Sequence, residues 1–252
     1  MSPGNNDIWI PANWPAPHWI KAGTTTKRAG TSLPPYAGLN LASHVGDEPE
    51  TVERNRALLQ HELQLPSPPL WLQQEHGARL ISSGEWSINV IADACFTRQG
   101  NIVCGILTAD CLPLLLCNKE GSQVAAVHLG WRGICTNILH EVRSSFDTDS
   151  SNLLAWIGPH IHAKCYEVGD DVRQACLRAI PGTEHAFTFT RKGKWQASLE
   201  TLVRRQLVKL GISMVYASNL CTFDEQARFY SYRREAETGR MASLIWMESD
   251  SN

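Results

Sequence analysis

The chain has 252 residues, of which 43% are hydrophobic and 19% charged, and its 23 basic and 25 acidic residues leave a net charge of -2. This composition is typical of a globular protein with a substantial core and gives no reason to expect a nucleic-acid partner. No apolar run predicts a membrane-spanning helix, and residues 1–23 lack the features of a secretory signal. The cysteines include no Cys-x-x-Cys pair, so we expect free thiols in a reducing cytoplasm.

The first half of the chain predicts an arm, a helix and several buried strands. Residues 1–20 carry four prolines and three tryptophans and predict an irregular arm packed on the body. Residues 46–66 predict a helix because apolar side chains recur at helical spacing, and residues 68–83 predict two short strands around a turn. Further apolar runs predict buried strands at 101–111, 112–118 and 122–130, of which the last two form a hairpin.

The second half alternates helices with strands. Helical spacing predicts helices at 134–146, 170–180 and 198–211, and Ser198 is suited to cap the last of them. Apolar runs predict strands at 152–159, 214–221 and 241–247. Because no repeat or flexible linker interrupts this alternation, we expect one α/β domain over residues 1–252, with parallel and antiparallel strands mixed.

Two reactive side chains lie where predicted buried strands meet polar or glycine-rich turns. Cys111 precedes the run 112–118, and His128 closes the run 122–130. If these strands pair as an antiparallel hairpin, the thiol and the imidazole converge. Such a pair suits a zinc site or a cysteine–histidine nucleophile. The structural alternative is a buried cysteine beside a core histidine.

His76 lies in a third polar turn and would complete a set of three metal ligands. Two imidazoles and a thiolate leave one tetrahedral position open, which is the pattern of catalytic zinc. Spacing alone does not select His76 over the other histidines. Asp93 and Asp110 each follow an apolar run. Either carboxylate would orient a ligand histidine, serve as an acid or base, or simply form a turn.

Basic side chains in two other segments predict anion binding. Arg132 in "GWRG" lies between glycines at the start of a predicted helix and suits a phosphate, although the glycines also fit a tight turn alone. The segment 230–241 combines tyrosines with arginines, including Tyr232 and Arg233. Such a cluster can hold a flat base and an anionic group, and the alternative is a solvated basic surface.

Six motifs together resemble those of a known family. In chain order they are "NLASHVGD", "TADCLP", "VHLGWRG", "IGPHI…YEVG", "FYSYRR" and "TGRM". The chain resembles, from about residue 24 to 246, bacterial single-domain members of the YfiH-type family, the polyphenol-oxidase or laccase-domain proteins. The resemblance implies a mixed α+β fold of the CNF/YfiH type, with two mixed β-sheets packed centrally and flanked by helices. Toxins that act as cysteine–histidine amidases share this fold.

The resemblance also implies a function and a site. Family members are described as zinc-dependent purine nucleoside phosphorylases for adenosine, inosine, guanosine and methylthioadenosine, with adenosine deaminase activity. It implies Zn²⁺, small-molecule partners, no nucleic-acid or membrane partner, and a cytoplasmic monomer or small homo-oligomer. The expected metal ligands are His76, Cys111 and His128. The expected catalytic residues are Cys111, His128, Asp93 and Asp110, and the expected substrate- or phosphate-binding residues are Arg132, Asn40, Tyr232 and Arg233.

Three other functions remain open at this point. A copper-dependent polyphenol oxidase is less favoured, because among nine histidines only "HIH" at 160–162 forms a His-x-His pair. A cysteine or zinc amidase editing peptidoglycan precursors would use Cys111 as nucleophile and His128 as base. A non-catalytic module braced by zinc would need a fourth ligand. The chain departs from common family residues at three positions, where it carries Glu75, Leu129 and Ser198.

Overall fold

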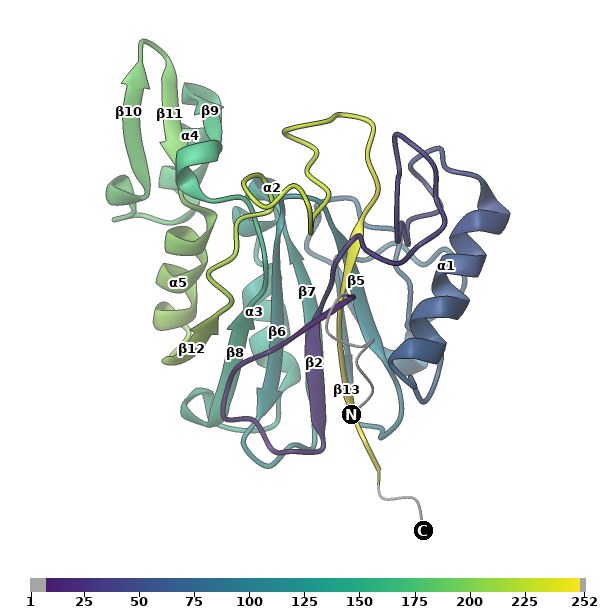
Figure 1. Ribbon diagram of the computed structural model, residues 1–252. Helices are drawn as coiled ribbons and strands as arrows, with labels where there is room; N and C mark the ends of the chain where they lie inside the picture. The colour runs from purple at the N-terminus through teal and green to yellow at the C-terminus, as the bar shows by residue number, and fades with distance from the viewer. Residues whose placement is uncertain (1–7, 250–252) are drawn as a thin grey trace.

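The computed structural model describes residues 8–249 and contains two large β-sheets packed face to face (Figure 1). The first sheet is antiparallel throughout, and its strands in spatial order are β1 (Trp9–Pro11), β2 (Ile20–Thr25), β13 (Met241–Met247) and β5 (Cys104–Thr108). The second is mixed, in the order β12 (Met214–Ala217), β8 (Leu153–Ile157), β6 (Leu112–Asn118), β7 (Val124–Leu129), β4 (Ala94–Thr97) and β3 (Leu80–Ser82).

A smaller antiparallel sheet and the helices complete the described part of the chain. The small sheet has the order β10 (Phe187–Arg191), β11 (Lys194–Ala197) and β9 (Glu167–Gly169). The α-helices are α1 (Pro49–Glu62), α2 (Trp131–Ile134), α3 (Ile138–Ser145), α4 (Asp170–Ala179) and α5 (Leu199–Lys209). Short 3₁₀ turns cover Ser83–Glu85, Ser150–Asn152, Ala163–Cys165 and Glu184–Ala186. No helix within residues 8–249 is both long and apolar enough to cross a membrane.

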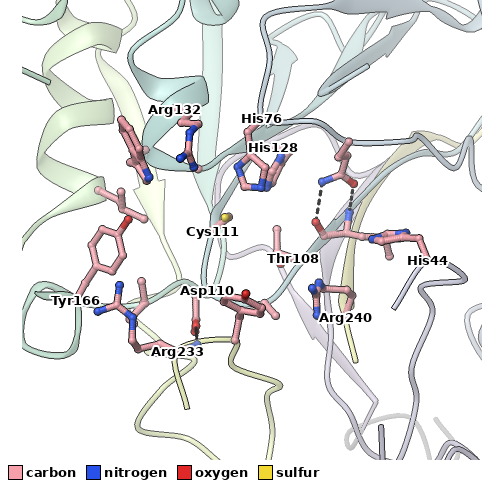
Figure 2. A pocket seen from close by; sticks show the side chains of 18 residues that line it. His44, His76, Thr108, Asp110, Cys111, His128, Arg132, Tyr166, Arg233 and Arg240 are labelled. Atoms are coloured by element: carbon pink, nitrogen blue, oxygen red, sulfur yellow. Dashed lines mark hydrogen bonds between the residues drawn. The ribbon is translucent and has the colours of Figure 1, made fainter. Parts of the chain in front are cut away.

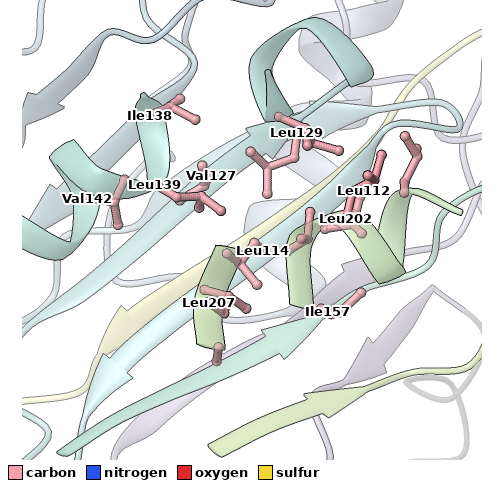
Figure 3. Close-up of a cluster of buried hydrophobic side chains, with 14 of the residues drawn as sticks. Leu112, Leu114, Val127, Leu129, Ile138, Leu139, Val142, Ile157, Leu202 and Leu207 are labelled. Atoms are coloured by element: carbon pink, nitrogen blue, oxygen red, sulfur yellow. The ribbon is translucent and has the colours of Figure 1, made fainter. Parts of the chain in front are cut away.

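Strand β6 explains why the run at 112–118 is apolar at nearly every position. Side chains alternate between the two faces of a strand, so a strand covered on both faces needs apolar residues throughout. Leu112 and Leu114 pack with Leu202 and other residues of α3 and α5 (Figure 3). Leu115 faces the opposite way and packs with Ile245 of the other sheet. The molecule therefore has one core between its sheets and another beneath α3 and α5.

Helix α1 covers the outer face of the four-stranded sheet, opposite α3 and α5 (Figure 1). Leu59 packs there with Leu244 and Trp246 of β13. The expected mixed α+β fold with two central sheets and flanking helices is therefore confirmed. Two details differ from the prediction. The four-stranded sheet is not mixed, and the three-stranded sheet was not expected, because most of β10 faces solvent and lacks an apolar pattern.

The predicted arm over residues 1–20 is not irregular throughout. Its residues 9–11 form β1, which pairs with β2 in the register Trp9 to Thr25. This pairing supplies the edge of the four-stranded sheet, and the indole of Trp9 lies beside that of Trp246. Residues 1–7 of the arm lie outside the described residues.

The chain changes sheets between β5 and β6, and this crossing sets the position of the cysteine. Only residues 109–111 separate the two strands, which belong to different sheets. Asp110 accommodates the turn with a φ of 89°, in the left-handed region. The hairpin of β6 and β7 has the predicted antiparallel pairing, with Pro113 opposite His128. Cys111 and His128 thus reach the same end of the two-sheet body.

Candidate active site

A cavity of about 500 Å³ opens at the end of the sheets where β5, β6 and β7 meet α2. Residues from distant parts of the chain line it, including the predicted His76, Cys111, His128, Arg132 and Arg233 (Figure 2). The predicted Tyr232 also lines it. The hairpin brings Cys111 and His128 together, as its antiparallel pairing predicts. His76 reaches them from the turn before β3.

These three residues, here called the metal trio, have the composition and spacing of a metal site. One donor atom of each side chain lies within 4.8 Å of the others. The rings of His76 and His128 meet edge to face, with 4.7 Å between their centroids. Two imidazoles and a thiolate are ligands that zinc accepts, so the residues present fit a zinc ion. No fourth Cys, His, Asp or Glu in the described part of the chain joins this group.

The carboxylate of Asp93 contacts both histidines of the metal trio. It accepts hydrogen bonds from the backbone N–H groups of Glu75, His76 and Gly77, at 3.3, 2.9 and 2.7 Å. These bonds hold a turn in which His76 has a φ of 59°. The Nδ1 atom of His128 lies 2.8 Å from Oδ1 of the same carboxylate. Asp93 therefore leaves Nε2 of His128 free to act as the ligand atom.

The same surroundings give the two histidines opposite pKa shifts. Burial and the neighbouring His128 lower the pKa of His76 to about 4. Burial also opposes the charged form of His128, but attraction to Cys111 and hydrogen bonds with Asp93 and Cys111 outweigh it and raise the pKa of His128 to about 9. In the metal-free protein at neutral pH, His76 is therefore neutral and His128 carries a proton.

The carboxylate of Asp110 is occupied by structural hydrogen bonds. It accepts from the hydroxyls of Thr222 and Ser231 at 2.6 and 2.9 Å, and from the backbone N–H of Arg233 at 2.7 Å. Figure 2 shows it directed away from the metal trio, toward Arg233. This geometry ties the turn of Cys111 to the C-terminal loops. It gives Asp110 a positioning role and does not support the expected acid or base role.

Three arginines and their aromatic neighbours form the rest of the wall. Arg132 lies over the ring of Trp131 at 4.5 Å, and Arg233 lies over the ring of Tyr166 at 4.9 Å. Arg240 lies 5.9 Å from the ring centre of Tyr232 on the other side of the cavity. The distances run from each guanidinium carbon to a ring centroid. The cavity therefore offers positive charge on two sides of the metal trio.

Asn40 does not line this cavity. Its side chain is fully buried, and its Oδ1 accepts from the backbone N–H groups of Arg240 and Ala42, at 3.0 and 3.1 Å. Its Nδ2 donates to Asp47 at 2.9 Å. The expected direct contact with substrate does not agree with this placement, because all of its polar atoms bond within the protein. Asn40 instead positions the backbone of Arg240.

Several residues that line the cavity were not predicted from the sequence. His44 and Tyr166 lie in the motifs "NLASHVGD" and "YEVG", so the motifs contained the signal, but neither residue was singled out. The side-chain amide of Gln74 donates to the backbone carbonyl of Leu107 at 2.8 Å and accepts from the backbone N–H of Leu107 at 2.7 Å. The hydroxyl of Thr108 is buried without a hydrogen-bond partner. Polar side chains of this kind have no periodicity that would reveal them in a sequence.

The three departures from common family residues lie outside the lining of the cavity. Glu75 is exposed, and its side chain accepts from Gln73 in a neighbouring hollow. Leu129 is fully buried in the core beneath α3 and α5. Ser198 caps α5 by accepting from the backbone N–H of Thr201 at 3.1 Å. Pocket polarity is therefore set by other residues.

Comparison with known proteins identifies the family. A family model described as multi-copper polyphenol oxidoreductase laccase matches residues 21–248. A protein of Escherichia coli (strain K12) named purine nucleoside phosphorylase YfiH is 42% identical over 239 residues, covering 94% of this chain and 98% of that protein. A Haemophilus influenzae protein named purine nucleoside phosphorylase is 42% identical over 241 residues, covering 95% and 99%. The chain belongs to this YfiH-type family.

Solved structures of the YfiH-type family have the same fold. A Neisseria meningitidis protein superimposes with a TM-score of 0.92 at 39% identity, covering 96% of this chain and all of that one. YlmD from Geobacillus stearothermophilus gives a TM-score of 0.90 at 28% identity, covering 99% and 98%. The family description refers to a metal-dependent activity, and the metal trio is a residue group able to hold a metal ion.

Proposed function

We propose that the chain is a zinc-dependent purine nucleoside phosphorylase for adenosine, inosine, guanosine and methylthioadenosine, with adenosine deaminase activity. The names of its relatives support the first activity. The observation that carries the proposal is that one cavity joins the metal trio to three arginines. A phosphorylase must hold an uncharged nucleoside and a phosphate anion together, and the arginines beside the metal trio offer positive charge for the phosphate.

In this proposal His76, Cys111 and His128 hold the zinc ion. When bound, zinc supplies Lewis-acid chemistry and the activation of water. Asp93 keeps both histidines in place through the turn of His76 and the ring of His128. A three-residue ligand set is typical of catalytic zinc, whereas structural zinc has four protein ligands. This difference argues against a module that zinc merely braces.

Phosphorolysis forms a bond between a phosphate oxygen and C1′ of the ribose while the bond from C1′ to N9 of the purine breaks. The purine leaves with the electron pair and takes up a proton. We assign Arg132 to the phosphate, with Arg233 beside it, because a guanidinium binds phosphate oxygens in pairs. Tyr232 offers an aromatic face to the purine.

Tyr166 is suited to donate a hydrogen bond in this cavity. Burial and the neighbouring Cys111 raise the pKa of the Tyr166 hydroxyl, so it stays protonated at neutral pH. Asp93 and Asp110 are both engaged in hydrogen bonds within the protein. The cavity lining therefore offers the phenol of Tyr166 as a donor, where the sequence had suggested the carboxyl groups of Asp93 and Asp110.

One specific observation favours a second function, a cysteine amidase acting on peptidoglycan precursors. His128 contacts both Cys111 and Asp93. In this arrangement Cys111 would be the nucleophile, His128 the base, and Asp93 the carboxylate that orients the base. Zinc would activate a phosphorylase that depends on it and would inhibit an amidase that needs the free thiolate. No comparable observation favours a multicopper oxidase, since buried His160 bonds to the carbonyl of Gly158 and belongs to neither candidate metal group among residues 8–249.

The test uses metal-analysed, zinc-loaded protein incubated with adenosine, with and without phosphate, and chromatography of the products. We expect adenine and ribose 1-phosphate only with phosphate, and inosine in both buffers. Cys111→Ser should abolish all three products. No product from the zinc-loaded protein would contradict the proposal. Cleavage of a peptidoglycan precursor by the zinc-free protein, blocked by added zinc, would establish the amidase.

A further inference from the structure

A second group of metal-binding side chains lies outside the cavity. One donor atom from each of Cys165, Cys221 and Asp224 lies within 4.8 Å of the others, the same spacing as in the metal trio. Within residues 8–249, these are the two groups of three or more Cys, His, Asp or Glu residues that meet this spacing. All eight cysteines are free thiols. We call this second group the Cys165 cluster.

We propose that the Cys165 cluster binds a thiolate-preferring divalent cation, of which Zn²⁺ is the physiological representative. Two thiolates and one carboxylate form a donor set that zinc accepts, with the remaining position open to water. On binding, each thiol gives up its proton to solvent, and two sulfur–metal bonds form with no change in oxidation state. This site would be separate from the metal trio.

The hydrogen bonds around the cluster leave its donor atoms available. Oδ1 of Asp224 lies 3.4 Å from Sγ of Cys165, while Oδ2 is paired with Nζ of Lys164 at 2.8 Å. The backbone N–H of His162 donates to Sγ of Cys221 at 3.4 Å. An N–H donor stabilises a thiolate, and Lys164 orients the carboxylate from its other oxygen.

The charges of the cluster balance when a divalent cation is bound. Two thiolates and the carboxylate of Asp224 carry three negative charges, and the cation and Lys164 supply three positive ones. Without a cation, deprotonation of both thiols would place like charges beside one another, which is unfavourable. The cluster is therefore built for a cation rather than for an anion. Asp224 is exposed and gives the ion a path from solvent.

The position of the cluster connects two segments that support the cavity. Cys165 immediately precedes Tyr166, which lines the cavity. Cys221 immediately precedes Thr222, whose hydroxyl donates to Asp110. A cation at the cluster would join these segments behind the cavity wall. We therefore expect the ion to influence the cavity through the positions of Tyr166 and Thr222 and to make no direct contact with substrate.

Cobalt binding by the Cys111→Ser protein tests this inference, because cobalt–thiolate absorption reports only ions held by cysteine. With Cys111 replaced, the metal trio has no thiolate, so the readout does not depend on the proposed enzymatic activity. We expect the reduced, metal-free variant to give a thiolate-to-cobalt charge-transfer band that saturates at one ion per chain and disappears when zinc is added.

Further substitutions locate the site. Adding Cys165→Ser should abolish the band, and adding the surface change Asp224→Asn should weaken cobalt binding by at least about tenfold. The matched control is Cys135→Ser, which alters a different close thiol pair, Cys135 and Cys176, with 3.2 Å between sulfurs. This control should leave the band unchanged.

Two results would overturn the inference. One is absence of the band in reduced Cys111→Ser protein whose thermal unfolding matches that of the parent. The other is a band that persists in the Cys165→Ser variant, or a cobalt affinity that Asp224→Asn leaves unchanged. Failure of the phosphorylase assay would bear on the metal trio alone and would leave this test intact.

Discussion

The carboxylate of Asp93 links both histidines of the metal trio. It is 1% exposed, and it bonds three consecutive backbone N–H groups as well as the ring of His128. A single side chain therefore sets the turn of one candidate ligand, His76, and the orientation of another, His128. The preorganisation of the site depends on a residue that does not itself belong to the candidate ligand set.

Asp93→Asn should weaken zinc binding about 10- to 100-fold, as is usual when a group that orients a ligand histidine is replaced. The amide puts an N–H donor where the carboxylate accepts several hydrogen bonds. Competition with a chromophoric chelator measures the affinity, in a Cys165→Ser background that leaves only the metal trio. The exposed Asp149→Asn is the matched control. Equal affinities of the Asp93 and Asp149 variants would contradict this role.

Zinc affinity should depend on pH through His128. Because the pKa of His128 is raised to about 9 in the metal-free protein, a proton must leave before the ring can bind the ion. Affinity should therefore fall as the pH decreases below about 9, and His76, with a pKa of about 4, should contribute no such dependence near neutrality. NMR titration of the imidazole signals checks both values. Titration of both rings near their ordinary pKa would refute the prediction.

At the scale of elements, α5 is a helix whose start is defined by a side chain. Ser198 accepts from the N–H of Thr201, and the stripe of Leu199, Leu202, Val203 and Leu207 is buried against the six-stranded sheet. The helix thus begins where its cap lies and packs through the face that its periodicity predicts. Its first residue, Leu199, also lines the cavity.

Ser198→Ala should lower the free energy of unfolding by about 1 kcal/mol, because the N–H of Thr201 loses its acceptor. Urea unfolding followed by circular dichroism measures the change. Ser144→Ala in α3 is the matched control, since Ser144 is exposed within a helix. An equal loss of stability in the two variants would argue against the cap.

Elements with strong local patterns could be predicted from the sequence. The helix at 198–211 and the hairpin of 112–118 with 122–130 have the expected positions, because periodicity and burial agree there. Helix α1 was also expected, and the acidic side chain of Asp47 before it looks in the sequence like a helix cap, but Asp47 instead bonds Ser32 and Asn40. A side chain with several competing partners cannot be assigned from its sequence neighbours alone.

The site, like the fold, could be predicted from the sequence only in part. The spacing of Cys111 and His128 indicated a pair, and the structure brings them together with His76. The roles of Asp110 and Asn40 could not be foreseen, because their hydrogen-bond partners lie up to 123 and 200 residues away in the chain. The sheet change at residues 109–111 was equally hidden, since strands of either sheet are apolar on both faces.

At the scale of the whole molecule, the cavity rests on the packing of the two large sheets. Leu115 is fully buried between them, together with Ile106, Trp156 and Ile245. The ends of β5, β6 and β7 stay in register at the cavity only while this core is intact. Stability of the sheet interface and geometry of the site are thus connected.

Leu115→Ala should lower the free energy of unfolding by about 2–5 kcal/mol, the usual cost of a cavity in a packed core. Guanidinium unfolding measures this value. The matched control is Leu33→Ala, since Leu33 is 76% exposed and its truncation should change stability by no more than about 0.5 kcal/mol. A small effect at Leu115 would mean that the interface between the sheets is not tightly packed.

The central claim is that phosphorolysis depends on one zinc ion held by the metal trio. The most direct measurement adds zinc stepwise to metal-free Cys165→Ser protein and follows phosphate-dependent release of hypoxanthine from inosine. We predict that activity rises in proportion to bound zinc, saturates at one ion per chain, and is absent from the corresponding Cys111→Ser variant. Full activity in the metal-free protein, or in the Cys111→Ser variant, would contradict the account.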